Sequence, residues 1–305
     1  MNSPFPRSPR KKEVSTPISN PDKIFWPEEG YTKLDLIKFY QAIFPRLHPY
    51  VKNRVLSLER CPGGMLGECF YQKEMPKGMP PDTPTKRIRH SGGSAKSTNY
   101  VVGGSLATQI ALVNLGCIAV HVANSRVSSL REPDWVCFDL DPESGKFSDA
   151  AQAALYIKEA LEAIHLVGFA KTSGSRGIHV LVPILTGPGT DEVLSFAETV
   201  CARVAAAHPQ ALTVEHSIAA RRGRVYLDPF RNGFLQTVVA PYSVRRRPHA
   251  PVSTPLDWSE VRSTLDPSDF NLGNFADRLK GRDPWRNFFE YRQSVEDAAK
   301  GLRTL

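Results

Sequence analysis

The chain has 305 residues, enough to bury one large hydrophobic core or two smaller ones. With 41% hydrophobic and 23% charged residues, its composition is that of an ordinary globular protein. The formal net charge of +8 favours polyanionic partners such as nucleic acid, although many basic proteins bind none.

The five cysteines are odd in number and scattered, and no two of them form a CxxC pair. This pattern argues against a zinc ribbon or a disulfide framework and fits a reducing cytosol. The polar beginning of the chain lacks the apolar stretch of a secretory signal. The most apolar segment, residues 101–122, is interrupted by Gly, Gln and Asn, which is typical of a buried helix and strand rather than a membrane span. We therefore expect a cytoplasmic protein without membrane contact.

The first half of the chain mixes helices with short strands. The capping-box pattern Thr32-Lys33-Leu34-Asp35 precedes apolar residues at helical spacing and predicts a helix that begins there. Residues 1–17 are polar and basic, and we expect them to be disordered. The other expected elements are strands at 55–58 and 68–72, a loop at 74–96, a helix at 105–115 and a strand at 118–122.

The second half alternates strands and helices. The expected elements are strands at 135–138, 169–171, 178–184 and 224–227, and helices around the apolar stripes 154–164 and 193–204. Ser148 is expected to cap the first of these helices and Gly168 to end it. The order of elements over 118–240 predicts a mixed sheet with helices on one face. Residues 248–268 form a Pro/Ser/Asp-rich connector, and residues 285–302 are expected to form a closing helix.

Two carboxylates follow the strand that begins at residue 135, in the pentapeptide Phe138-Asp139-Leu140-Asp141-Pro142. Because side chains alternate across a strand, Asp139 and Asp141 point to one face while Leu140 points into the core. Neighbouring carboxylates repel each other in a partly dry cleft, and a divalent cation between them removes that repulsion. A strand end followed by a turn, where aspartate is common, is the alternative explanation.

A third acid, Asp228, ends another apolar strand and precedes Pro229. Three acids at the ends of core strands are able to form the cluster that holds two metal ions about 3.5–4 Å apart in phosphoryl-transfer enzymes. The cationic surroundings of Asp228 favour an anionic substrate over a solvated surface. These cations are Arg221, Arg222, Arg224, Arg231, Arg245, Arg246 and Arg247.

A glycine-containing loop, Ser173-Gly174-Ser175-Arg176-Gly177, lies between two expected strands. Its glycines let backbone N–H groups approach an anion, its hydroxyls donate hydrogen bonds, and the arginine supplies a forked charge. The loop is neither a Walker A loop nor a GxGxxG motif. It therefore indicates an anion site without a nucleotide-binding helix, and an ordinary hairpin turn is the alternative.

Taken in order, the segments FDLDP, SGSRGIH and VYLDPFRNG, with QTVVAPYSVR behind them, resemble the polymerase domain of bacterial DNA ligase D. That domain is a branch of the archaeo-eukaryotic primase superfamily, and the resemblance extends over residues 18–290. It implies an α+β, two-lobed primase-polymerase fold with mixed or antiparallel central sheets flanked by helices. It also implies an N-terminal part at 18–115 with DNA-binding elements, a catalytic part at 116–247, and a connector and C-terminal helix at 248–305 packed on the domain.

In that family the paired and the later aspartates, here Asp139, Asp141 and Asp228, are catalytic and hold two divalent cations, Mn²⁺ or Mg²⁺. The resemblance implies nucleotide-binding roles for His121, Ser173, Arg176, His179, Arg221 and Arg245. The family commonly has lysine where Arg176 stands, which keeps the charge but changes the geometry of its contact.

A second site implied by the resemblance binds the 5′-phosphate of a DNA break. Asn20 and Lys23, with Lys33 ten residues later, resemble this pocket. The predicted helix start adds free N–H groups that favour an anion, although two ordinary surface lysines are the alternative. Phe70 and Tyr71 match an aromatic stretch that the family places against template DNA. Because neighbouring strand residues face opposite ways, we expect one of this pair to lie in the core.

The resemblance implies a template-dependent nucleotidyltransferase that fills or extends ends in double-strand break repair by non-homologous end joining and prefers ribonucleotides. Its expected partners are NTP or dNTP, DNA ends with a 5′-phosphate and a 3′-overhang or gap, and Ku and a DNA ligase in the bacterial cytosol or nucleoid. A DxD metal-dependent glycosyltransferase and a non-catalytic DNA-end-binding module remain alternatives. A stand-alone polymerase and a piece of a longer ligase are both compatible with the sequence.

Overall fold

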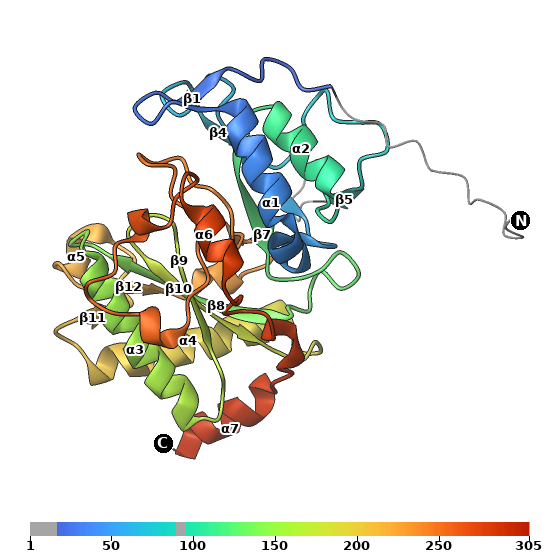
Figure 1. The fold of residues 1–305 in the computed structure, drawn as a ribbon. Helices are drawn as coiled ribbons and strands as arrows, with labels where there is room; N and C mark the ends of the chain where they lie inside the picture. Colours follow the sequence, from blue (N-terminus) through green and yellow to red (C-terminus); the bar gives the residue numbers. More distant parts are fainter. Residues whose placement is uncertain (1–16, 90–95, 305) are drawn as a thin grey trace, which may run out of the picture.

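The computed structural model describes residues 17–89 and 96–304, and it shows an α+β chain arranged as two lobes (Figure 1). One lobe is built on a four-stranded antiparallel sheet and the other on a five-stranded mixed sheet. The segment 1–17, expected to be disordered, lies outside the described residues except for Pro17. Within the two described ranges, no helix has the length and apolar character that a membrane crossing requires.

The N-terminal lobe packs two helices, α1 and α2, on an antiparallel sheet. Its elements are α1 Lys33–Val51, α2 Leu106–Asn114, β3 Leu56–Arg60, β4 Phe70–Gln72, β7 Cys117–Ala123 and β13 Thr237–Val239. The strand order is β13-β7-β3-β4. Helix α1 begins as expected, because Thr32 and Asp35 form a capping box. Two short ribbons complete the lobe, β1 Ile24–Trp26 with β2 Tyr31–Thr32, and β5 Thr85–Arg89 with β6 Ser97–Val101.

The C-terminal lobe has helices on one face of its sheet. Its strands are β8 Trp135–Pro142, β9 Phe169–Thr172, β10 Ile178–Pro183, β11 Leu212–Thr213 and β12 Val225–Asp228, in the order β11-β12-β8-β10-β9. Its helices are α3 Phe147–Ala163, α4 Thr190–Ala207 and the short α5 Ile218–Arg221. Helices α3 and α4 pack against β8, whose other face is turned to the N-terminal lobe.

Strand β8 is buried on both faces and divides its side chains between two cores. Val136 and Phe138 pack in the core beneath the helices, whereas Trp135 and Cys137 join the core of the N-terminal lobe. Since side chains alternate along a strand, Asp139 continues the second series. Its carboxylate therefore faces the other lobe rather than the helices.

Aromatic residues from the end of the chain join the lobes. Trp285 stacks on Phe288 with ring centroids 5.0 Å apart, and it meets Tyr50 of the N-terminal lobe and Phe169 of the C-terminal lobe edge-on at 5.6 and 6.0 Å. Its indole N–H donates to the carbonyl of Ala170 at 3.0 Å. The remaining elements are η1 Phe230–Asn232, η2 Trp258–Glu260, η3 Pro267–Asp269, α6 Phe275–Lys280, η4 Phe288–Glu290 and α7 Val295–Thr304.

Several expected elements are wrong. The single mixed sheet over 118–240 is split, because β7 and β13 pair with each other in the N-terminal sheet. The expected loop 74–96 contains β5, whose only buried residue is Ile88, so no apolar alternation marks it. The expected closing helix 285–302 is instead two separate elements, η4 and α7. The aromatic residues before Val295 are spaced to contact both lobes and not at the interval of a helical repeat.

The expected ends of helix α3 are also wrong. The helix begins at Phe147, its N-cap Lys146 makes no side-chain capping bond, and the Ser148 hydroxyl instead bonds Asp149 at 3.3 Å. It ends at Ala163, well before Gly168. A Cβ at Gly168 would lie 3.0 Å from the side chains of both Leu161 and Val180, so this glycine permits close packing of helix on sheet.

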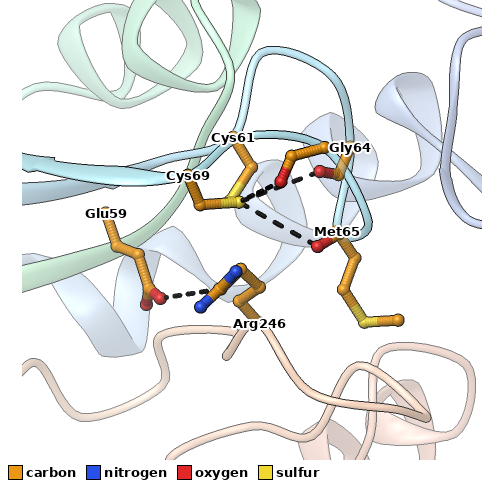
Figure 2. The surroundings of a disulfide bond; sticks show 7 residues. Glu59, Cys61, Gly64, Met65, Cys69 and Arg246 are labelled. Carbon is orange, nitrogen blue, oxygen red and sulfur yellow. Dashed lines mark hydrogen bonds and ion pairs between the residues drawn. A yellow bond between two sulfur atoms is a disulfide. The ribbon is translucent and has the colours of Figure 1, made fainter.

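Cys61 and Cys69 form a disulfide across the connection from β3 to β4 (Figure 2). The cysteine pattern argues against a disulfide framework, and it does not indicate this single bond. Their spacing of eight residues matches no recognised motif, and only the pairing of β3 with β4 brings their Cα atoms to 4.4 Å. Cys117, Cys137 and Cys201 are free and buried.

Replacing Trp285 by alanine should lower the free energy of unfolding by about 3–5 kcal/mol, because a large buried ring is lost from the contact between the lobes. Urea unfolding followed by circular dichroism measures the change. Tyr291→Ala is the control, since that side chain is 41% exposed, and it should cost less than about 1 kcal/mol. Equal losses for the two variants would contradict the role given to Trp285.

Candidate active site

Four ionisable side chains form a row across the C-terminal sheet. Asp228 on β12 pairs with Asp139 on β8, Asp139 pairs with His179 on β10, and His179 pairs with Lys171 on β9. Directly paired residues of antiparallel strands point to the same face, so these side chains lie next to one another. Asp141 stands two residues after Asp139 and shares that face. The structure thus brings Asp228 next to the two aspartates from which the sequence separates it.

The three carboxylates differ in exposure and in pKa. The side chains of Asp139 and Asp228 are 17% and 14% exposed, and that of Asp141 is 49% exposed. Burial raises the pKa of Asp141 and of Asp228, and the charge of Asp139 adds to this rise. Burial also acts to raise the pKa of Asp139, but His179 and Arg231 outweigh it and hold that pKa well below its usual range. Asp139 therefore stays ionised and repels its two neighbours.

Arg231 lies between two of the carboxylates. Its Nε is 3.1 Å from Oδ2 of Asp139 and 3.3 Å from Oδ2 of Asp228. The turn that carries it is held by the buried Asn232, whose side-chain amide bonds both the N–H and the carbonyl of Cys137 on β8. The Arg231 side chain is 42% exposed, so its guanidinium has room to move away from the carboxylates.

A metal ion is compatible with these carboxylates after a local change. In the described ranges, no three His, Cys, Asp or Glu side chains are already arranged around one possible metal position. The carboxylates are hard oxygen ligands on neighbouring strands, and Asp141 and Asp228 have pKa values raised by burial and by the charge of Asp139. Arg231 now provides the positive charge between Asp139 and Asp228, so a cation would require this guanidinium to withdraw.

The glycine loop lies against the carboxylates. The hydroxyl oxygen of Ser173 accepts two backbone N–H bonds within the loop, each at 3.2 Å, and so fixes its shape. A Cβ at Gly177 would lie 2.4 Å from the carbonyl oxygen of Leu140, so glycine is required for this approach to β8. Arg176 is exposed, and its charge opposes the rise in the pKa of Asp141. The loop therefore brings the positive charge of Arg176 close to the aspartates.

A cavity of about 440 Å³ lies between the two sheets. Tyr71 and His121 line it from the N-terminal lobe, and Asp139 and His179 line it from the C-terminal lobe. Arg245 also lines it, and its NH1 donates to the carbonyl of Ser173 at 2.8 Å. The cavity thus joins three of the six residues with expected nucleotide contacts, His121, His179 and Arg245.

His121 is a neutral histidine in the wall of this cavity. Burial lowers its pKa well below the usual range, and the charges of Arg245 and Lys171 add to this. The Nε2 atom is buried and has no hydrogen-bond partner within residues 17–89 and 96–304. The ring meets Tyr71 edge-on, with centroids 5.4 Å apart. A buried ring nitrogen without a partner is available to a polar ligand.

Arg221 lies at the other side of the carboxylates and does not line the cavity. Its NH1 is 3.6 Å from Oδ2 of Asp141, and its guanidinium lies over the ring of Tyr226 at 4.0 Å. The structure therefore places it beside the aspartates, where it balances the most exposed carboxylate.

The lysines expected to bind a 5′-phosphate lie together in the N-terminal lobe, away from the cavity. The backbone N–H of Lys33 donates to the carbonyl of Lys23 at 2.8 Å. The backbone N–H of Lys23 in turn donates to the carbonyl of Asn20 at 3.2 Å, which closes a turn. The Lys33 ammonium is nearly buried and donates to the carbonyls of Ser19 and Asn114 at 2.6 and 3.0 Å. Burial, with the charge of Lys23, lowers the pKa of Lys33.

The start of α1 does not offer the free N–H groups expected there. The first three helical residues already donate, Lys33 to Lys23, Leu34 to Pro21 at 2.9 Å and Asp35 to the hydroxyl of Thr32 at 3.2 Å. An anion at this site would therefore depend on the two ammonium groups rather than on the helix end.

The expectation that one of Phe70 and Tyr71 lies in the core is wrong. Phe70 is 41% exposed and Tyr71 is 61% exposed, because β4 is a short edge strand. Phe70 lies beside the guanidinium of Arg60 at 5.4 Å, whereas Tyr71 lines the cavity. Both aromatic faces are therefore accessible to bases.

Comparison with known proteins settles the family. The profile described as "LigD, primase-polymerase domain" matches residues 32–285, most of the chain. The chain belongs to the LigD primase-polymerase family. Membership argues against the glycosyltransferase alternative, because the carboxylates and the glycine loop both lie inside the matched region.

Two LigD relatives are each 30% identical to this chain over the residues that they align with it. The multifunctional non-homologous end joining protein LigD of Pseudomonas aeruginosa is 30% identical over 302 residues, which cover 93% of this chain and 34% of that protein. The bifunctional LigD of Bacillus subtilis is 30% identical over 278 residues, covering 90% of this chain and 44% of that protein. This chain therefore spans less than half the length of these relatives.

A solved LigD structure has the same fold. The polymerase domain of Mycobacterium tuberculosis ligase D, in complex with DNA, superimposes with a TM-score of 0.82 at 24% identity. The match covers 91% of this chain and 99% of that domain. The expected α+β primase-polymerase fold is thus confirmed.

Sequence reasoning assigned no separate role to three residues at the LigD site: Arg231, Asn232 and Lys171. The sequence shows Arg231 only as one of the cations near Asp228, and its position three residues after Asp228 is the signal that it reaches the same carboxylates. Asn232 follows directly and clamps the turn. Lys171 lies on an apolar strand, and nothing in the sequence shows that it is fully buried with its ammonium 2.6 Å from the Ser253 hydroxyl.

Lys171 predicts a pH dependence of stability. Burial lowers its pKa from 10.5 to about 7. Between these values the unfolded chain binds one more proton than the folded chain, so the free energy of unfolding rises with pH in this window. Relative to Lys171→Met, the wild-type chain should gain about 2 kcal/mol between pH 7 and pH 9.

Urea unfolding of both proteins at the two pH values measures this gain. Lys280→Met is the control, because this exposed lysine has a pKa raised by Asp277 and its loss should remove no such rise. A constant difference between wild type and Lys171→Met would contradict the shifted pKa.

Proposed function

We propose that this chain is a template-dependent nucleotidyltransferase that adds nucleotides to a 3′-hydroxyl and prefers ribonucleotides. The observation that carries the proposal is the meeting of Asp139, Asp141 and Asp228 on one sheet face, beside a cavity with basic and aromatic walls. The relatives are named as non-homologous end joining proteins, and we extend end filling in double-strand break repair to this chain.

Two divalent cations, Mn²⁺ or Mg²⁺, are proposed at the three aspartates. When bound, they neutralise charge on the attacking and leaving oxygens. Asp139 is the ligand best kept ionised, since His179 and Arg231 hold its pKa low. Asp141 and Asp228 have raised pKa values, so a cation that relieves their repulsion would bind with release of any proton they hold. Arg231, displaced from the carboxylates, is then free to contact a phosphate.

The incoming nucleotide is proposed to occupy the cavity between the sheets. Arg245 and Arg176 supply positive charge on the side of the glycine loop, where the triphosphate is expected. His121 offers an unpaired Nε2 in the opposite wall, and the exposed face of Tyr71 beside it suits stacking on a base. The cavity thus provides separate places for the charged and the aromatic parts of a nucleotide.

DNA is proposed to bind along the N-terminal lobe. The exposed ring of Phe70 beside Arg60 fits a template base and its backbone. Asn20, Lys23 and Lys33 form the proposed pocket for the 5′-phosphate at the far side of a gap. Ku and a DNA ligase are the proposed protein partners in end joining.

Replacing Asp139 by alanine should lower metal-dependent primer extension at least ~100-fold, because a bound cation contributes several kcal/mol of charge stabilisation. Extension of a 3′-overhang with UTP or TTP, in Mn²⁺ or Mg²⁺, measures both the rate and the expected preference for UTP. The exposed Asp277→Ala is the matched control. If Asp139→Ala extended the primer at the wild-type rate, the metal assignment would be refuted. If the wild-type protein did not extend the primer at all, a non-catalytic DNA-end-binding module would be the remaining explanation.

Replacing Lys23 by alanine should weaken binding of a gapped duplex with a 5′-phosphate about tenfold, the loss expected for one charge-assisted hydrogen bond. Binding of the 5′-hydroxyl duplex should not change. Fluorescence anisotropy at constant salt measures both affinities, with the exposed Lys38→Ala on α1 as control. An equal loss for both duplexes would show that Lys23 acts only through the general positive field.

A further inference from the structure

The disulfide closes a surface loop of the N-terminal lobe. Cys61 follows β3 and is fully buried, whereas Cys69 precedes β4 and is partly exposed. Between them the loop is open to solvent, and Leu66 at its tip is 76% exposed. The three other cysteines are buried, so Cys69 is the one partly exposed residue among the chain's five cysteines, all of which lie in the described ranges.

One side of this loop holds Lys23. The Lys23 ammonium donates to the carbonyl of Pro62, directly after Cys61, at 2.5 Å. The N–H of Met65 bonds the carbonyl of Phe25 at 2.8 Å, and a Cβ at Gly64 would lie 2.9 Å from the neighbouring backbone of β1. The loop therefore fixes both the Lys23 side chain and the strand that follows it.

The other side of the loop reaches the partner of Lys33. The N–H of Cys61 donates to the carbonyl of Gly116 at 2.7 Å. Gly116 lies two residues after Asn114, whose carbonyl accepts the Lys33 ammonium at 3.0 Å. Both lysines of the proposed phosphate pocket thus depend on backbone that touches the disulfide-closed loop.

The loop also has places for a reduced Cys69. Figure 2 shows the Cys69 sulfur directed at the carbonyls of Gly64 and Met65, which are each 3.9 Å away. The carbonyl of Gly67 lies 3.4 Å from the same sulfur. A disulfide sulfur has no hydrogen to donate, but reduction separates the two sulfurs, and a Cys69 thiol that moves toward the loop would find these acceptors nearby. Reduction would therefore leave no buried polar group without a partner at Cys69.

We propose that Cys61 and Cys69 are a reversible thiol-oxidation site that controls the affinity of this chain for 5′-phosphorylated DNA ends. The oxidant is a small-molecule disulfide. The Cys69 thiolate attacks it and releases one thiol, and the Cys61 thiolate then attacks the mixed disulfide and releases the second. The two cysteines lose two electrons, which reduce the oxidant, and the two cysteine protons end on the released thiols. A dithiol reverses the reaction.

The disulfide acts by restricting the loop. With the bond closed, Pro62 holds the Lys23 ammonium in place and leaves two of its three hydrogens for a phosphate. With the bond open, the loop gains conformational freedom and Lys23 must be ordered at the moment of binding, which lowers affinity. This inference rests on the proposed phosphate pocket but not on the polymerase chemistry.

The test measures binding of one gapped duplex, with a 5′-phosphate or a 5′-hydroxyl, by fluorescence anisotropy. Wild-type protein is oxidised with glutathione disulfide or reduced with dithiothreitol, and alkylation with mass spectrometry counts the free thiols. The oxidised protein should prefer the 5′-phosphate, and reduction should lower that preference at least about threefold. Cys69→Ser and Cys61→Ser should resemble the reduced wild type and ignore dithiothreitol, whereas Cys201→Ser should respond as the wild type does.

Two results would overturn the inference alone: a 5′-phosphate preference that is unchanged although both thiols are shown to be free, or cysteines 61 and 69 that glutathione disulfide does not join. An oxidised protein without any 5′-phosphate preference would overturn the inference together with the pocket. Primer extension, measured in parallel, would show whether the polymerase assignment stands in that case.

Discussion

The alternation of side chains along β8 is the constraint on which the site depends. This strand is buried on both faces, so each residue must suit one of two cores. Val136, Phe138 and Leu140 satisfy the helix-covered core, which leaves Asp139 and Asp141 on the face turned to the other lobe. A shift of one residue would bury both carboxylates beneath the helices, where no cation or substrate could reach them.

The row from Lys171 to Asp228 shows how charge is arranged on that face. Burial lowers the pKa of Lys171 to about 7 and that of His179 to about 4, so the two basic groups in the row hold their protons weakly. Negative charge therefore accumulates at the aspartates, where Arg231 only partly balances it. Such an arrangement does not favour stability, and it is typical of a site that is completed by a ligand.

The sequence was sufficient for the carboxylate cluster and the glycine loop, because both depend on strand periodicity and on local turn chemistry. It was also sufficient for the start of α1, where Thr32 and Asp35 act on their own helix. It was insufficient wherever distant contacts decide. The pairing of β7 with β13, the bond between Cys61 and Cys69 and the burial of Lys171 each depend on residues far away or on an edge that no local pattern marks. The position of Arg231 near Asp228 is visible in the sequence, but its direction toward the aspartates is not, because that direction depends on the turn that Asn232 holds.

The fastening of the lobes by Trp285 and its aromatic neighbours has a mechanical consequence. Within the C-terminal sheet the carboxylates are tied by backbone ladders, whose geometry tolerates little displacement. Between the sheets, by contrast, Trp285 meets Tyr50 and Phe169 only through edge-on ring contacts between side chains. The spacing of the aspartates is therefore set by the backbone of one sheet, whereas the width of the cavity is set by side-chain packing between the two lobes.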